Sequence, residues 1–130
     1  MRWDVRARLI EVARNRETIT YGQLMKEFRI PRGHPTPGIG IGWVVGEISE
    51  YEHSEGRPFL SVIVVKAGSE TRICPKGHPG GGFFSVVGLP PHLKRDTDEF
   101  SERLTIEEQN FVKEEQERVW DYWTTHEDGE

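Results

Sequence analysis

Residues 19–28 of the chain read ITYGQLMKEF, and this stretch decides the fold that we expect. The β-branched residues 18–20 favour an extended backbone. Thr20 is followed three residues later by Gln23, which is the spacing of a capping box at a helix start. The helix should end before Pro31, because a proline ring disfavours helical geometry at the preceding residue. The stretch therefore predicts a short extended piece that leads directly into a short helix.

Two further helical patterns lie on either side of this stretch. Residues 3–14 place their apolar side chains mainly on one face, and Asp4 can cap the first turn. Residues 41–51 repeat apolar side chains at helical spacing and are followed by Gly56, a helix stop. Residues 31–38, PRGHPTPG, form a constrained loop between the second and third helices. Three helices in this order predict a helix-turn-helix unit, a fold used most often to contact nucleic acid.

Two apolar segments later in the chain predict strands. Residues 58–66, PFLSVIVVK, are β-branched and apolar at their centre, which is typical of a strand covered on both faces. Residues 82–87, GFFSVV, predict a second strand, and Ile19 is the expected third edge of the same small sheet. We therefore expect an α+β winged helix-turn-helix, with three helices, a small antiparallel sheet and an added C-terminal helix.

The charges of the chain, which sum to −5, are unevenly divided along its length. Residues 1–95 hold 14 Lys and Arg against 9 Asp and Glu, a balance of +5, and residues 96–130 hold 3 against 13, a balance of −10. We expect a winged-helix-like body over 1–95 and an acidic linker with an amphipathic C-terminal helix over 96–130. A basic body of this kind favours nucleic acid as a partner. The alternative is that both parts only form solvated surface.

Length and composition exclude several classes of protein. A chain of 130 residues has the size of one ordinary domain and can bury a core without cross-links. Its single cysteine excludes an internal disulfide framework. No secretory leader pattern stands at the N-terminus, and no segment approaches the roughly 20 apolar residues of a membrane-spanning helix. We therefore expect a cytoplasmic protein that contacts no membrane.

Two loops rich in glycine and proline carry most of the candidate binding residues. The loop at 31–38 can offer cations and backbone amides to a phosphate. The alternative interpretation is a rigid connector whose polar side chains face solvent. The segment at 74–82, CPKGHPGGG, is the expected tip of the wing, where a basic side chain can touch a phosphate backbone. The predicted nucleic-acid contacts are Tyr21, Gln23, Arg32, His34, Arg72, Lys76 and His78.

Cys74 raises a catalytic alternative. A zinc site would need four ligands, and one Cys with one His in this segment falls short, so we expect no metal and no cofactor. A nucleophilic Cys74 would need a histidine base, and the sequence supplies no triad spacing to identify one. The candidate bases are His34, His53, His78 and His92. The other interpretation is a small, partly buried thiol without a catalytic role.

Several short motifs resemble the C-terminal DNA-binding domain of alkylguanine DNA alkyltransferases and alkyltransferase-like proteins. They are ITYGQL, the proline-containing loop, GIGIGWVVGEI at 38–48 and GGGFF at 80–84, and the similarity spans residues 3–88. The resemblance implies winged-helix architecture. The family's reactive PCHR motif is absent, since RICPKGHPG stands at 72–80, so Cys74 is not implied as an alkyl acceptor. The chain also looks like uncharacterised bacterial proteins with an LSVIVV strand followed by a Pro-Gly and GFF segment, which implies no activity.

Residues 105–123 predict a long helix that begins at a capping box from Thr105 to Glu108. Its aromatic side chains, among them Phe111, Trp120 and Trp123, offer too much apolar area to leave in water. The helix either packs back on the body, or forms a homodimer seam or a surface for a protein partner.

Three functions are compatible with these patterns. The leading hypothesis is a non-enzymatic nucleic-acid-binding module whose ligand is duplex DNA. The first alternative is a protein-interaction or assembly module that uses the aromatic C-terminal helix. The second is a DNA-modification recognition protein of alkyltransferase-like type, which would act through Cys74.

Overall fold

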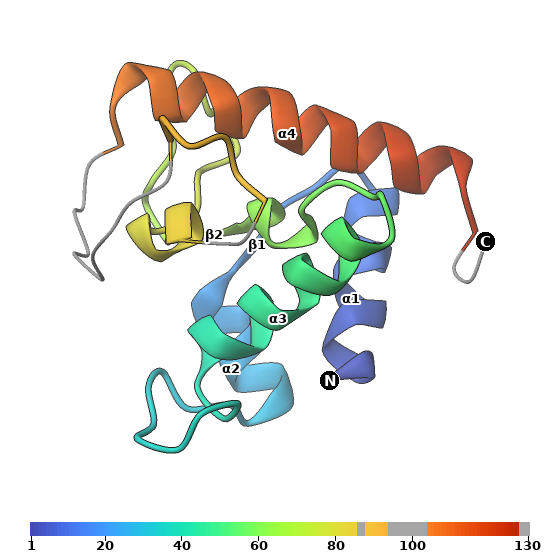
Figure 1. Cartoon of the computed structure of the whole chain (residues 1–130), viewed down its shortest axis with the longest axis vertical. Helices are drawn as coiled ribbons and strands as arrows, with labels where there is room; N and C mark the ends of the chain where they lie inside the picture. Colours follow the sequence, from blue (N-terminus) through green and yellow to red (C-terminus); the bar gives the residue numbers. More distant parts are fainter. Residues whose placement is uncertain (86–87, 94–103, 128–130) are drawn as a thin grey trace.

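Four α-helices, two short 3₁₀-helices and a two-stranded sheet make up the residues that this computed structural model describes, 1–85, 88–93 and 104–127. In chain order the elements are α1 (Trp3–Arg14), β1 (Ile19–Thr20), α2 (Tyr21–Phe28), α3 (Ile41–Ser54), η1 (Leu60–Ile63), β2 (Val64–Val65), η2 (Gly81–Ser85) and α4 (Ile106–Thr125). Figure 1 shows α4 lying across one end of the molecule, with α2 and the loop that follows it at the other end. The fold is therefore α+β.

The helix boundaries follow from local capping. Thr20 Oγ1 accepts a hydrogen bond from the Gln23 amide at 3.1 Å, and α2 begins directly after Thr20 as predicted. The predicted box at Thr105 is complete, because Thr105 Oγ1 accepts from the Glu108 amide while Glu108 Oε1 accepts from the Thr105 amide. At its other end α2 closes on Arg29, which adopts the left-handed conformation with φ of 54°.

The sheet is parallel, and the prediction of an antiparallel sheet is wrong. β1 pairs with β2 in a register that aligns Ile19 with Val64 and Thr20 with Val65. The helices α2 and α3 stand between the two strands along the chain, and a crossover of this kind brings the chain back in the same direction. No antiparallel wing is present within the part of the chain that the structure describes.

Each of the two apolar segments that we expected to be strands contains a 3₁₀-helix. In the first, Leu60–Ile63 form η1 and only Val64–Val65 pair as a strand. In the second, Gly81–Ser85 form η2, and residues 86–87 lie outside the described residues. Every residue in the range 59–65 is buried. The apolar pattern thus indicated an interior position and not a strand.

The aromatic face of α4 packs against the rest of the core. Val112, Val119 and Trp123 are at most 2% exposed, and they share one hydrophobic cluster with α1, α3 and η1. Phe111 and Trp120 are half-buried and pack against the same cluster. The helix therefore packs back on the body, and these aromatic side chains do not form an open surface for a partner.

None of the helices that the structure describes has the length and the apolar character that a membrane-spanning segment needs.

Polar side chains of α4 also hold the irregular segments beneath it. Gln116 donates hydrogen bonds from Nε2 to the carbonyl oxygens of Val62, at 3.0 Å, and Gly77, at 3.1 Å. The buried carboxylate of Glu115 accepts from the Phe59 amide at 2.8 Å. Buried backbone groups need partners, and here side chains replace the ladder of a longer strand.

Candidate nucleic-acid interface

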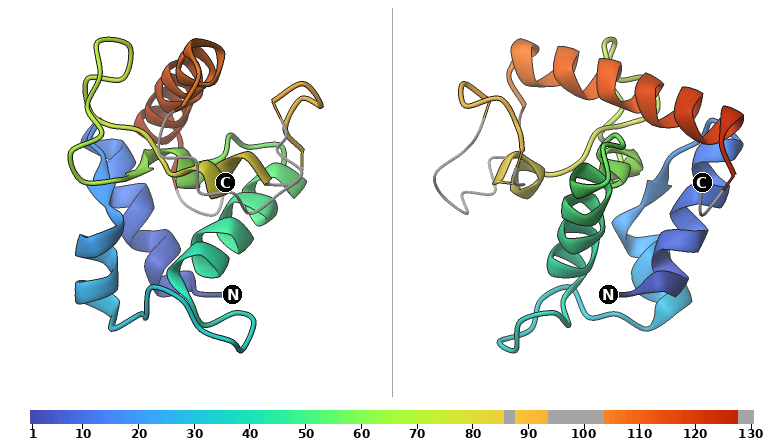
Figure 2. Two further views of the ribbon diagram at one scale, coloured as in Figure 1. Left: turned by 90° about the vertical axis from the view of Figure 1, so that its left-hand side faces the viewer. Right: turned by 45° about the vertical axis from the view of Figure 1, so that its right-hand side comes forward.

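The α2–α3 loop, residues 29–40, lies at the end of the molecule away from α4 (Figures 1 and 2). Its two ends are anchored, because the Ile30 amide donates to the Met25 carbonyl and the Ile41 amide donates to the Pro31 carbonyl at 2.9 Å. The residues between these anchors, 31–39, are all exposed. The loop therefore presents its side chains to solvent from a fixed base.

Two cations of this loop are exposed and have no ion-pair partner among the residues that the structure describes. Arg29 and Arg32 form no salt bridge with any residue that the structure describes. No Asp or Glu occurs from 28 to 46, and the nearest preceding acid, Glu27, has another partner. By contrast, Arg8 on α1 pairs with Glu27 at 2.9 Å. The loop is thus a local basic site on an acidic chain, and electrostatic attraction depends on such local fields.

His34 adds a polar ring to the same loop. The ring is exposed, and its Nδ1 accepts a hydrogen bond from the Thr36 amide at 3.0 Å. With Nδ1 as the acceptor, the proton of the neutral imidazole resides on Nε2. His34 therefore keeps one donor free for a ligand beside Arg32.

Two large apolar side chains are exposed where the loop leads into α3. Trp43, in the first turn of α3, is 55% exposed, and Ile39 is 41% exposed. The indole Nε1 of Trp43 lies 3.6 Å from the position that a Cβ on Gly38 would take, so the ring lies beside the end of the loop. Exposed large apolar groups beside cations are typical of interaction surfaces.

Neither Trp43 nor Ile39 was among the residues predicted from sequence, although a signal for Trp43 existed. The apolar residues of α3 that recur at helical spacing are buried, namely Ile41, Val44, Val45 and Ile48. Trp43 lies outside that periodic set, so it belongs on the outer face of the helix. An apolar side chain that breaks the period of its helix is therefore a candidate contact.

The basic character of this surface ends one turn further along α3. Glu47 and Glu50 are exposed on the same helix, and the amino group of Met1 lies 3.5 Å from Glu47. The part of this surface without acids therefore comprises the loop and the first turn of α3.

Two predicted contacts on α2 have partners within the protein. The hydroxyl of Tyr21 accepts a hydrogen bond from the Gly80 amide at 3.2 Å. Burial raises the pKa of this hydroxyl, and the hydrogen bond from Gly80 acts in the opposite direction. Gln23 is exposed, and its Nε2 donates to Glu27 at 2.7 Å.

The other three predicted contacts lie in the segment 66–80, at the α4 end of the molecule (Figures 1 and 2). Arg72 is exposed there, whereas His78 is 6% exposed and has its Nδ1 2.8 Å from the Pro79 carbonyl oxygen. Lys76 donates to the carbonyl of Arg16 and sits 5.1 Å from the centre of the Trp120 ring. The structure therefore does not bring this segment together with Arg32 and His34.

Cys74 is buried and closely surrounded. Its side chain is fully inaccessible, and its Sγ donates to the Gln109 carbonyl at 3.4 Å. Burial raises the pKa of the thiol, while Thr71 and Lys113 oppose that change. A buried, protonated thiol is a poor nucleophile, so the geometry favours the structural interpretation of Cys74. Within the described residues no group of three or more His, Cys, Asp or Glu side chains is placed to hold a metal.

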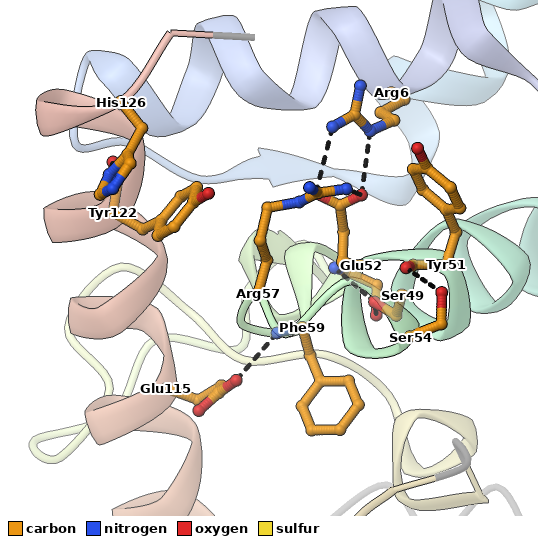
Figure 3. A network of polar contacts seen from close by, with 11 residues as sticks. Arg6, Ser49, Tyr51, Glu52, Ser54, Arg57, Phe59, Glu115, Tyr122 and His126 are labelled. Carbon is orange, nitrogen blue, oxygen red and sulfur yellow. Dashed lines mark hydrogen bonds and ion pairs between the residues drawn. The ribbon is translucent and has the colours of Figure 1, made fainter. Parts of the chain in front are cut away.

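A second polar cluster, shown in Figure 3, joins α1 to α3. Glu52 is fully buried, and both its oxygens accept hydrogen bonds from Arg6 and from Arg57. The carboxylate raises the pKa of the Arg57 guanidinium. Because four hydrogen bonds occupy this carboxylate, the cluster is complete without a ligand.

No protein-family model, curated protein or solved structure matched the chain. The functional inference below therefore depends on the chemistry of the exposed surface.

Proposed function

We propose that this protein is a non-enzymatic nucleic-acid-binding module that contacts phosphates through the α2–α3 loop and the first turn of α3. The observation that carries the proposal is a pair of exposed cations, Arg29 and Arg32, that have no ion-pair partner among the described residues. They lie in a stretch free of acids, 28–46, that also holds the exposed Trp43. Phosphate contacts by basic side chains dominate affinity for nucleic acid, and aromatic side chains add contact with bases.

The order of the helices supports the same assignment. In a helix-turn-helix protein the second of two successive helices is presented to the nucleic acid, and α3 holds that position after α2. We extend the proposal to a helix-turn-helix relationship of these two helices, as the sequence resemblance to alkyltransferase-like proteins implies. The parallel pairing of β1 with β2 distinguishes the chain from a standard winged helix.

The net charge of −5 does not oppose this proposal. The outer face of α4 carries the exposed acids Glu107, Glu114, Glu117 and Asp121. This helix lies at the opposite end of the molecule from the loop (Figure 1). Interactions between exposed charges are largely screened beyond a Debye length of about 8 Å at physiological ionic strength, so a phosphate at the loop experiences mainly the loop cations.

Charge-removal variants test the proposal in the full chain. The double variant Arg29→Gly with Arg32→Gln should weaken binding of fluorescein-labelled oligonucleotides. It should also reduce the slope of the logarithm of the binding constant against the logarithm of the salt concentration, by roughly 0.7 to 0.9 for each phosphate contact that is lost. The matched control is Arg72→Gln with Lys113→Gln. It also removes two positive charges, from exposed side chains that lie outside the loop. Equal losses in the two variants, or no binding by the unmodified chain at low salt, would refute the proposal.

A further inference from the structure

We infer that the ligand of this surface is a single strand of nucleic acid, with one unpaired base stacked on Trp43 and the adjoining phosphates at Arg29 and Arg32. This inference rests on the proposed function and specifies its ligand. It departs from the duplex DNA that the sequence led us to expect.

The surroundings of Trp43 suit a flat ligand. The indole is 55% exposed in the first turn of α3. A Cβ placed on Gly46, one turn along the helix, would meet no atom within 4 Å, whereas a Cβ on Gly38 would lie 3.6 Å from the indole Nε1, so the loop borders the ring on that side only as a glycine. Every base has a π-face, and stacking on an exposed aromatic ring does not depend on base identity. The ring is therefore open to a base that has no stacking partner of its own.

The charge distribution on α3 argues against a duplex. A recognition helix that lies in the major groove brings several of its turns close to the phosphates of both strands. Here the exposed Glu47 and Glu50 follow the first turn directly, and both would face those phosphates. Like charges at short distance repel, so α3 can approach a polyanion only with its first turn.

The described residues also provide no wing that could make a second contact beside the α2–α3 loop. The segment 66–80, where we expected the tip of a wing, is tied down by hydrogen bonds from Gln116 to Gly77 and from Cys74 to Gln109 of α4. It lies at the other end of the molecule from the α2–α3 loop (Figure 2). The basic surface is consequently short, and a short stretch of single strand needs no second groove contact.

A matched tryptophan provides the control for this inference. Trp3 on α1 is 54% exposed, almost the same as Trp43, but its ring packs edge-on against Tyr51 with centroids 5.1 Å apart. Arg6 also lies 5.9 Å from the centre of the Trp3 ring. Trp3 is thus as exposed as Trp43, but its ring already contacts Tyr51 and Arg6 of the same chain.

Fluorescence anisotropy with the full chain at low salt tests the inference. The probes are fluorescein-labelled oligothymidylate, oligouridylate and a duplex of equal length. We expect either single strand to bind more tightly than the duplex. Trp43→Ala should weaken single-strand binding roughly 5- to 150-fold, Trp43→Phe should retain most of it, and Trp3→Ala should leave it unchanged.

Two results would overturn the inference while leaving the proposed function in place. One is duplex binding as tight as or tighter than single-strand binding, and the other is equal affinity of the Trp43→Ala and Trp3→Ala variants for the single strands. Binding to none of the three probes would instead refute the proposed function itself, and would leave a protein partner as the occupant of this surface. Circular dichroism of each variant verifies that it is folded.

Discussion

Arg6 of α1 donates a hydrogen bond from Nε to Oε2 of Glu52 on α3 across 3.0 Å, and the two side chains are only 8% and 0% exposed. Arg57 approaches the same carboxylate, with its Nε 2.9 Å from Oε1. This arrangement joins α1 to α3, and α3 carries the proposed interface at its first turn. The buried pair therefore connects the stability of the fold to the position of the binding surface.

Replacing the shared carboxylate should destabilise the protein strongly. Glu52→Gln removes the buried negative charge that accepts hydrogen bonds from both guanidinium groups, and removing one partner of a buried pair costs about 3–5 kcal/mol. Urea denaturation should show a lower midpoint with an unchanged slope. The control is Glu50→Gln, an exposed position on the same helix, which should change the free energy of unfolding by at most about 0.5 kcal/mol. Similar small effects of both substitutions would show that the buried pair does not hold α1 to α3.

Two substitutions of Arg29 should separate the effect of its charge on binding from the effect of its backbone strain on stability. Its φ of 54° is a left-handed conformation that glycine adopts freely. Arg29→Gly and Arg29→Ala remove the same charge, so both should weaken oligonucleotide binding to the same extent. In thermal denaturation the glycine variant should be more stable than the alanine variant by roughly 1 kcal/mol, because only alanine retains the strain.

The opposite ranking of the two variants would show that the C-terminal end of α2 is not strained at this residue. Arg16 has nearly the same φ of 53°, but it also pairs with Asp121 at 3.0 Å. Arg16→Gly should therefore gain less stability than Arg29→Gly, since it loses that contact.

Cys74 should be unreactive in the folded protein and should make stability depend on alkaline pH. Folding raises the pKa of this thiol, so its contribution is fully present below the unfolded value of about 8.5 and is lost as the pH rises through the folded value. The free energy of unfolding should fall above about pH 8.5 in the unmodified chain and fall less in Cys74→Ala. An aromatic disulfide reagent should label Cys74 only after denaturation, and rapid labelling of the native protein would contradict the burial.

The features that sequence reasoning placed correctly are local ones. The starts of α2 and α4 depend on pairs of residues three positions apart, Thr20 with Gln23 and Thr105 with Glu108, and both starts are confirmed. The inward packing of α4, one of the two interpretations that the sequence left open, follows from its aromatic side chains. The exposed position of Arg32 and His34 agrees with a loop rich in proline and glycine, but their contact with nucleic acid stays a prediction.

The features that sequence reasoning missed depend on contacts between distant parts of the chain. The run around Val62 is 3₁₀-helical because Gln116, far away in sequence, supplies a partner for its backbone. The glycine-rich segment around His78 is a packed connection instead of a wing, since Gln116 of α4 donates a hydrogen bond to its Gly77 carbonyl and His78 itself is buried. Such side-chain partners have no local signal. The exposure of Trp43 did have a local signal, because Trp43 lies outside the set of apolar residues that recur at helical spacing in α3.

The most direct test of the proposed interface is nuclear magnetic resonance of the ¹⁵N-labelled full chain during titration with a short oligothymidylate. The chain has four tryptophans, and we expect the indole signal of Trp43 to shift together with the backbone amides of the α2–α3 loop. The indole signal of Trp123, in the core, and the amides of α4 should remain in place. Shifts confined to α4 or to the segment 66–80, with the signals of Trp43 and the loop unchanged, would contradict it.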